Sequence, residues 1–185
     1  MRSIQVSAVV RVLCVACGAG ALAATVQAGG DKGAYERARA SAQSTYEAAA
    51  RRCDALHGNA RDVCLAEAKE ARTKREQNAE AAYQATPKAR AHAQEEIADA
   101  HYKVARERCD ERSGNDKDVC VKVAKAERAK AKADAKARRR IAEARGDAAK
   151  EKREADYKVA AEKCDAMSGE AKTACVREAR ARFGM

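Results

Sequence analysis

The sequence predicts an all-α protein. The expected architecture is three tandem αα-hairpins, each closed by a disulfide. Their long Ala-rich charged helices are expected to form an extended arrangement or a loose bundle or coiled coil. The first observation is composition: 36% of the residues are charged, 3% are aromatic, and there is one proline. Past residue 28, Leu, Ile, Val and Phe together number only 12, too few for a large compact core. Alanine, glutamate, lysine, arginine and glutamine, which dominate, are strong helix formers.

The second observation is an internal repeat, Y-x-x-A-x-x-x-C-D-x-x-x-G-x-x-x-x-x-C-x-x-x-A, which occurs three times at spacings of 56 and 55 residues. Such a match predicts a tandem array. We divide the chain into a signal peptide at 1–28 and hairpin repeats at 29–86, 87–141 and 142–185, the third of them shortened. The pattern is filled by Tyr46, Ala49, Cys53, Asp54, Gly58, Cys64 and Ala68, then by Tyr102, Ala105, Cys109, Asp110, Gly114, Cys120 and Ala124, and then by Tyr157, Ala160, Cys164, Asp165, Gly169, Cys175 and Ala179.

Each stretch from one cysteine to the next, such as CDALHGNARDVC, is predicted to form the tight turn of a hairpin. Gly58 suits the left-handed C′ position that ends a helix, and Asn59 is a good N-cap for the next one. Asp62 lies near the positive start of that helix. Cys53 precedes the glycine by five residues and Cys64 follows it by six, so they face each other. The other copies repeat the turn at Gly114, Asn115 and Asp118, and more weakly at Gly169 and Glu170.

A disulfide between two helices requires small neighbours, because it holds the Cα atoms about 4.4–6.8 Å apart. The hairpin register supplies them. It pairs Ala49 with Ala68, Ala105 with Ala124 and Ala160 with Ala179, and it sets Tyr46, Tyr102 and Tyr157 against Ala71, Ala126 and Ala181.

The six cysteines of the repeats are expected to form disulfides, since an even number in an exported chain favours them. Reduced or redox-active thiols and a metal site are the alternatives. Zinc prefers four ligands at short spacings, whereas these pairs are C-x10-C and His57 occurs in one copy only. We therefore expect no metal and no cofactor. The expected bridges are Cys53–Cys64, Cys109–Cys120 and Cys164–Cys175.

Residues 1–28 are interpreted as a secretory signal peptide. The first eleven residues carry Arg2 and Arg11 and no acidic residue. An apolar run then occupies 12–26, and Val26-Gln27-Ala28 is a small-x-small cleavage pattern. Cleavage after about Ala28 leaves six cysteines, a net charge of about +8 and a periplasmic location. The alternative is an uncleaved membrane anchor, but the run is short and rich in glycine and alanine. We expect no retained transmembrane helix.

Between the hairpins the helices are predicted to be long. Thr86 as N-cap and Pro87 at the first helical position start a new helix after the first hairpin. No proline follows the second hairpin, and Gly146-Asp147 is the weak point there. The chain from Asn115 to Ser168 can therefore form one helix of about 80 Å. In total we expect six helical segments.

No catalytic motif is present: the sequence has no glycine-rich phosphate loop, no H-E-x-x-H and no G-x-S-x-G. His57, His92 and His101 do not recur in register, and acidic pairs such as Glu95-Glu96 lie among lysines and arginines. We expect a protein that is not an enzyme.

The strongest charge feature is the segment 122–140, with nine basic and two acidic residues. A basic helical stripe attracts polyanions. We expect no nucleic acid as partner, because the signal peptide removes the chain from the cytosol and no aromatic residues interleave to stack bases. Anionic lipid or lipopolysaccharide headgroups are the candidate ligands, and a solvated helix without ligand is the alternative. The stripe comprises Lys122, Lys125, Arg128, Lys132, Lys136 and Arg139.

The hairpin motif C-D-x-x-x-G-N-x-x-D-V-C with Ala/Lys/Glu-rich flanks, after a signal peptide, resembles a family of exported proteobacterial proteins. These are labelled TolA-like or "cell envelope biogenesis protein TolA". The resemblance covers about residues 31–185. It implies the periplasm and a role in the cell envelope, and it carries no functional residues. The likeness to TolA itself is to its long Ala/Lys-rich helix.

Three functions remain open from the sequence. The first is a non-enzymatic periplasmic spacer or interaction surface whose partners are envelope proteins, with a homo-oligomer also possible. The second is a binder of anionic envelope components through residues 122–140. The third is a thiol- or metal-handling protein that uses the C-x10-C pairs.

Overall fold

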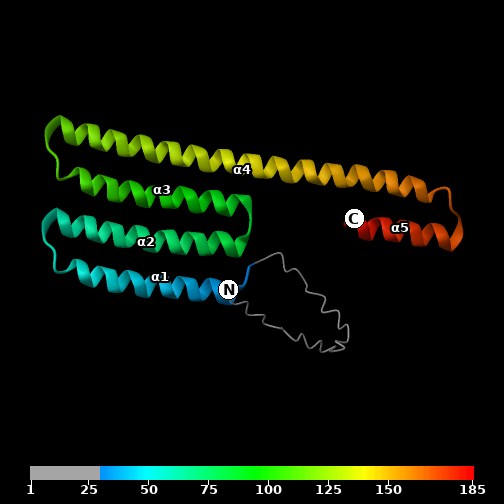
Figure 1. The fold of residues 1–185 in the computed structure, drawn as a ribbon, viewed down its shortest axis with the longest axis horizontal. Coiled ribbons are helices and arrows are strands. Elements are labelled where there is room, and N and C mark those ends of the chain that lie inside the picture. Colours follow the sequence, from blue (N-terminus) through cyan, green and yellow to red (C-terminus); the bar gives the residue numbers. More distant parts are fainter. Residues whose placement is uncertain (1–29) are drawn as a thin grey trace, which may run out of the picture.

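The computed structural model describes residues 30–185, so the predicted signal peptide lies outside the described residues (Figure 1). The described chain folds into α-helices joined by short turns, which confirms the predicted all-α class. The helices are α1 (Lys32–Cys53), α2 (Gly58–Gln84), α3 (Pro87–Cys109), α4 (Gly114–Cys164) and α5 (Gly169–Phe183).

The helices form a single antiparallel layer. Each helix packs only against the helix before it and the helix after it in the sequence. Figure 1 shows α1, α2, α3 and the first half of α4 side by side, while the second half of α4 extends beyond the layer and carries α5. We call α1–α3 with the first half of α4 the helical layer, and residues 142–185 the third hairpin. Of the predicted arrangements the extended one occurs: the hairpins lie side by side or apart, without the closed core of a bundle.

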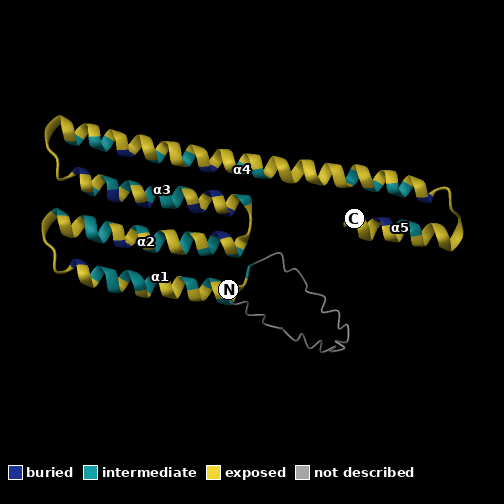
Figure 2. Ribbon diagram, in the orientation of Figure 1, coloured by how far each residue is buried: buried dark blue, intermediate teal, exposed yellow. Residues whose placement is uncertain are grey.

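The buried residues are small, as the composition requires. The core of the described chain consists of alanines, one cysteine from each bridge, and Val104. The central helix α3, which lies between α2 and α4, contributes the largest share (Figure 2). Alanine buries little area, so close helix approach and the disulfides, rather than large apolar side chains, hold these helices together.

The turns correct one detail of the sequence prediction. Gly58 does have a positive φ of 57°, as do Gly114 and Gly169. It does not end the first helix, however: α1 ends at Cys53, and Gly58 is the first residue of α2. The four residues between them, 54–57, are needed to reverse the chain, and the glycine then turns it into the second helix.

The predicted N-caps of the second helices are also wrong. The N-cap positions of α2, α4 and α5 are His57, Ser113 and Ser168, none of which makes a side-chain capping bond. Asn59 follows the glycine, already inside α2. By contrast, the predicted start of α3 is confirmed: the Thr86 hydroxyl accepts a hydrogen bond from the Ala89 amide at 3.0 Å, with Pro87 in the first turn.

α4 is one continuous helix of 51 residues, about 76 Å long. The prediction of six helical segments is wrong for this reason: Gly146 does not interrupt α4, so residues 30–185 form five helices. One glycine costs a helix only about 1 kcal/mol relative to alanine, and strong helix formers surround this one. The predicted boundary between residues 141 and 142 lies inside α4.

The chain enters the layer at Gly30. Its amide donates to the Tyr83 carbonyl at 2.8 Å, which ties the segment before α1 to the end of α2. A Cβ at this position would lie 2.8 Å from the Ala82 carbonyl oxygen and from the Tyr83 Cα. Both are backbone atoms, so only glycine fits here.

Candidate functional site

The three predicted disulfides are confirmed in their pairing. Cys53–Cys64, Cys109–Cys120 and Cys164–Cys175 each hold Cα atoms 5.7 Å apart, within the expected range. One sulfur-bearing residue of each bridge is fully buried between its two helices. While the bridges are intact, these sulfurs are not available as thiolate nucleophiles or metal ligands.

The aspartate of the repeat has a role that the sequence analysis missed. Asp54 pairs with Arg61 at 3.1 Å, and the equivalent pairs are Asp110–Lys117 at 2.8 Å and Asp165–Lys172 at 2.9 Å. Each pair links the end of one helix to the first turns of the next. The hydrogen bond from Lys117 lowers the pKa of Asp110. The sequence does contain a pattern that predicts these ion pairs: a basic residue follows each aspartate by seven positions.

The tyrosines of the repeat contact arginines of the neighbouring helix. The Arg72 guanidinium lies 5.4 Å from the centre of the Tyr46 ring, and Arg128 lies 5.2 Å from that of Tyr102. In the third copy the Tyr157 hydroxyl accepts a bond of 3.3 Å from the Arg180 Nε. The tyrosine therefore links the two helices of each hairpin.

The six residues of the predicted basic stripe do not all lie on a free surface. Arg128 and Lys132 turn toward α3 and bind the two carboxylate oxygens of Asp99. The Lys132 Nζ lies 2.7 Å from Oδ2. Arg139 lies 3.6 Å from Glu143 on its own helix. The residues that stay exposed, without an ion pair among residues 30–185, are Lys122, Lys125 and Lys136.

Asp99 is thus the acceptor that joins α3 to α4. Burial raises the pKa of its carboxyl group, but the hydrogen bonds from Arg128 and Lys132 outweigh burial and leave the pKa below its ordinary value of 3.8. A folded-state pKa below the unfolded value means that protonation favours unfolding. This contact therefore contributes stability above about pH 4, and the contribution is lost as the pH falls through the folded-state value.

Replacing Asp99 with Asn should destabilise the α3–α4 contact by roughly 1–2 kcal/mol at neutral pH, because two cations lose their shared carboxylate. The difference from wild type should shrink as the pH falls below 4. Urea unfolding at a series of pH values measures both effects.

Asp134→Asn is the matched control, since Asp134 is an exposed acid of α4 without an ion pair in the described chain. It should leave stability nearly unchanged. An Asp99→Asn protein as stable as this control at pH 7 would show that the Asp99 contact contributes nothing.

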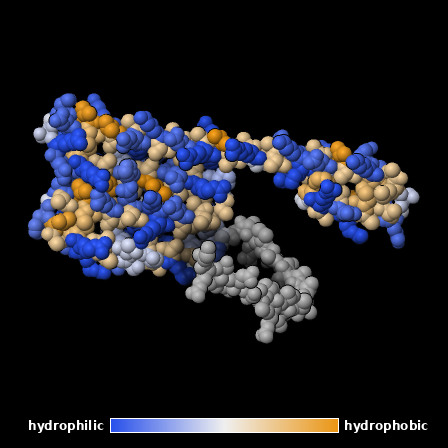
Figure 3. All heavy atoms as spheres, in the orientation of Figure 1, coloured by the Kyte–Doolittle hydropathy of each residue, from blue (hydrophilic) through white to orange (hydrophobic). Residues whose placement is uncertain are grey.

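Lys122, Lys125 and Lys136 lie within about 60° of one another around α4, because each residue of an α-helix is rotated by about 100° from the one before it. Arg140, which follows Lys122 by five full turns, lies on the same side. We call these four residues the outer basic face. Figure 3 shows hydrophilic residues along the length of α4.

Within residues 30–185, no helix has the length and apolar character needed to cross a membrane. The same part of the chain holds no cluster of three histidine, cysteine or carboxylate residues arranged to bind a metal ion. We found no matching family model, no matching curated protein and no matching solved structure for this chain.

Proposed function

We propose that the protein is a non-enzymatic component of the cell envelope, exported to the periplasm through a cleaved signal peptide, where it acts as a helical spacer or interaction surface. The observation that supports this most is the build of α4. A single helix of about 76 Å joins a layer at one end to a separate hairpin at the other. Such an arrangement holds two surfaces at a distance.

The disulfides support the compartment. All six cysteines between residues 30 and 185 are bridged in pairs, and bridges of this kind persist in oxidising compartments such as the periplasm. The resemblance to TolA-like envelope proteins points to the same place.

Crosslinking in living cells tests this function. A photo-reactive amino acid at Lys130 in the layer and at Lys172 in the third hairpin should capture different envelope proteins from the two ends. Fractionation should place the protein in the periplasm, shortened by about 28 residues. Recovery of the uncleaved chain in the cytosol, or failure of both positions to crosslink, would contradict the proposal.

A second candidate function, binding of anionic envelope lipids, is favoured by the outer basic face. Its lysines are exposed and are not used in packing α4 against α3. Each base near an anionic membrane contributes at most roughly 1 kcal/mol. Three or four together can decide between bound and free protein.

Changing Lys122, Lys125 and Lys136 to Gln should weaken co-sedimentation with anionic vesicles about tenfold or more, since the attraction is electrostatic. Wild-type binding should fade with salt, because the Debye length falls from ~10 Å at 0.1 M to ~3 Å at 1 M. Glutamine keeps the helix propensity of lysine.

The control for this variant removes the same charge elsewhere: Lys69, Lys74 and Lys88 are also exposed lysines outside the ion pairs of the described chain. Their change to Gln should leave most binding intact. Equal losses in both triple variants would show that only net charge matters, and binding indifferent to salt would reject the hypothesis.

A further inference from the structure

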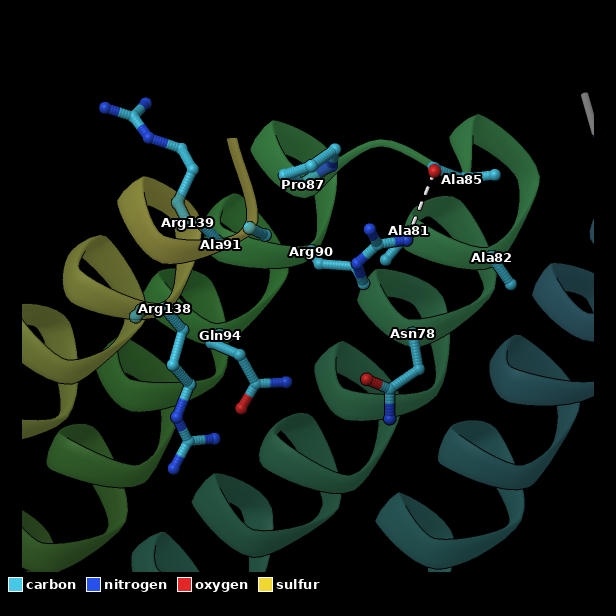
Figure 4. Close-up of a pocket in the computed structure, with 12 residues that line it drawn as sticks. Asn78, Ala81, Ala82, Ala85, Pro87, Arg90, Ala91, Gln94, Arg138 and Arg139 are labelled. Atoms are coloured by element: carbon cyan, nitrogen blue, oxygen red, sulfur yellow. Dashed lines mark hydrogen bonds between the residues drawn. The ribbon is translucent and has the colours of Figure 1, made fainter. Parts of the chain in front are cut away.

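A groove of ≈ 670 Å³ crosses the helical layer where the end of α2 and the start of α3 meet the middle of α4. Its volume lies in the range of small-molecule sites. All three helices contribute to its walls, and alanines together with Pro87 form most of the lining (Figure 4). The surface presented to a ligand is therefore largely apolar and consists of alanine methyl groups and the proline ring.

The polar groups of this groove are all cationic or neutral. Arg90, Arg138 and Arg139 line it with the amides Asn78 and Gln94, and none of its lining residues within the described chain is acidic. In Figure 4 Arg90 reaches from α3 toward α2, while Arg138, Gln94 and Asn78 extend in a similar direction from the three helices. A groove with this lining attracts an anion.

Arg90 has donors that its own hydrogen bond does not use. Arg90 donates from Nη1 to the Ala85 carbonyl at 3.1 Å, which fixes the side chain at the edge of the groove and leaves its other donors free of that bond. Arg139 lines the groove with its stem rather than with free donors: its Nε is enclosed by protein, 3.6 Å from Glu143, and so cannot meet a ligand. In Figure 4 its guanidinium extends away from Arg90 and Arg138.

We infer that this groove binds an anionic amphiphile with a single hydrocarbon chain, its carboxylate or phosphate head held by Arg90 or Arg138 and its chain lying along the alanines. An inorganic anion alone would leave the apolar lining uncovered. A neutral lipid would gain nothing from the positive charge of Arg90 and Arg138. The apolar lining and the arginines together favour a ligand that has both a hydrocarbon chain and an anionic head.

The groove is separate from the outer basic face. Arg138 follows Lys136 by two residues, which places it about 160° away around α4. The Arg90 and Arg138 variants therefore leave the outer basic face unchanged, and failure of vesicle binding would not affect this inference.

Isothermal titration of the purified full chain, with its disulfides formed, tests the ligand class. The probes are dodecanoate, dodecyl phosphate, neutral dodecyl maltoside and inorganic phosphate, with each amphiphile kept below its micelle concentration. Dodecanoate or dodecyl phosphate should bind, and the tighter of the two identifies the head group. Equal binding of dodecyl maltoside, equal binding of inorganic phosphate, or no binding of either anionic amphiphile would overturn the inference.

The variants locate the site. Arg90→Gln with Arg138→Gln should weaken binding about tenfold or more, because charge-assisted hydrogen bonds are lost. Gln94→Glu should also weaken binding, because it adds a carboxylate of nearly the same shape as the amide.

The control variant is Arg145→Gln with Arg153→Gln. It removes the same charge from exposed positions of α4 outside the groove and should bind as wild type. Circular dichroism verifies that each variant is folded. Unchanged binding by the folded Gln94→Glu protein would overturn the assignment.

Discussion

Removal of the Cys164–Cys175 bridge, by changing both residues to Ala, is expected to release α5 from α4. α5 has 15 residues and packs against α4 alone, and isolated helices of about this length are marginal in water. Only Cys164 and Ala179 are buried in the third hairpin. The bridge closes a loop of about a dozen residues, which contributes about 3 kcal/mol.

Hydrogen exchange measures this release. The amides of 169–183 should lose most of their protection in the variant, while the amides of α1–α3 should not change. The matched control is Cys53→Ala with Cys64→Ala, because α2 also packs against α3 and should keep its protection. Full protection of 169–183 in the first variant would show that packing alone holds α5.

Replacing Gly146 with Pro is expected to break α4 in the middle. Proline removes one helical hydrogen bond and clashes with the preceding turn, at a cost of about 3 kcal/mol. A Cβ at Gly146 would meet no atom within 4 Å, so the layer and the third hairpin should remain folded while the helix between them kinks. Gly146→Ala is the opposite control: it should stabilise α4 by about 0.5–1 kcal/mol.

The repeat made most of the fold predictable. The spacing of Cys53 and Cys64 around Gly58 determined the pairing, and the proline at position 87 determined where α3 begins. The turn of each hairpin was predicted less well. A glycine with positive φ can follow the end of the first helix or begin the second helix, and the sequence does not distinguish the two. Only the need for four loop residues to reverse the chain settles that point.

The arrangement of the hairpins was not predictable from local pattern. Comparison of the repeats explains it in part: Arg153 occupies the position of the buried Ala42 and Ala98. That position lies between helices in the first two copies, whereas Arg153 is exposed on the unpaired part of α4. A long charged side chain there is incompatible with the close helix packing that alanine allows.

The basic stripe shows why charge patterns alone are ambiguous. Lys132 and Lys136 lie on nearly the same side of a helix, yet one binds Asp99 and the other is exposed. The difference depends on the neighbouring helix, and nothing in residues 122–140 marks Asp99 as the partner. Likewise, the groove at Arg90 and Arg138 joins segments far apart in sequence.

In this structure α4 is one continuous helix that holds the third hairpin away from the layer. The direct measurement is the distance between spin labels at Lys130 and Lys152, both exposed and on either side of Gly146, attached through non-cysteine chemistry so that the disulfides stay intact. A continuous helix predicts one narrow distribution near 33 Å between the two backbone positions, from about 1.5 Å per residue, and a shorter, broader one for Gly146→Pro. A broad or short distribution in the wild-type protein, indistinguishable from the proline variant, would contradict the account.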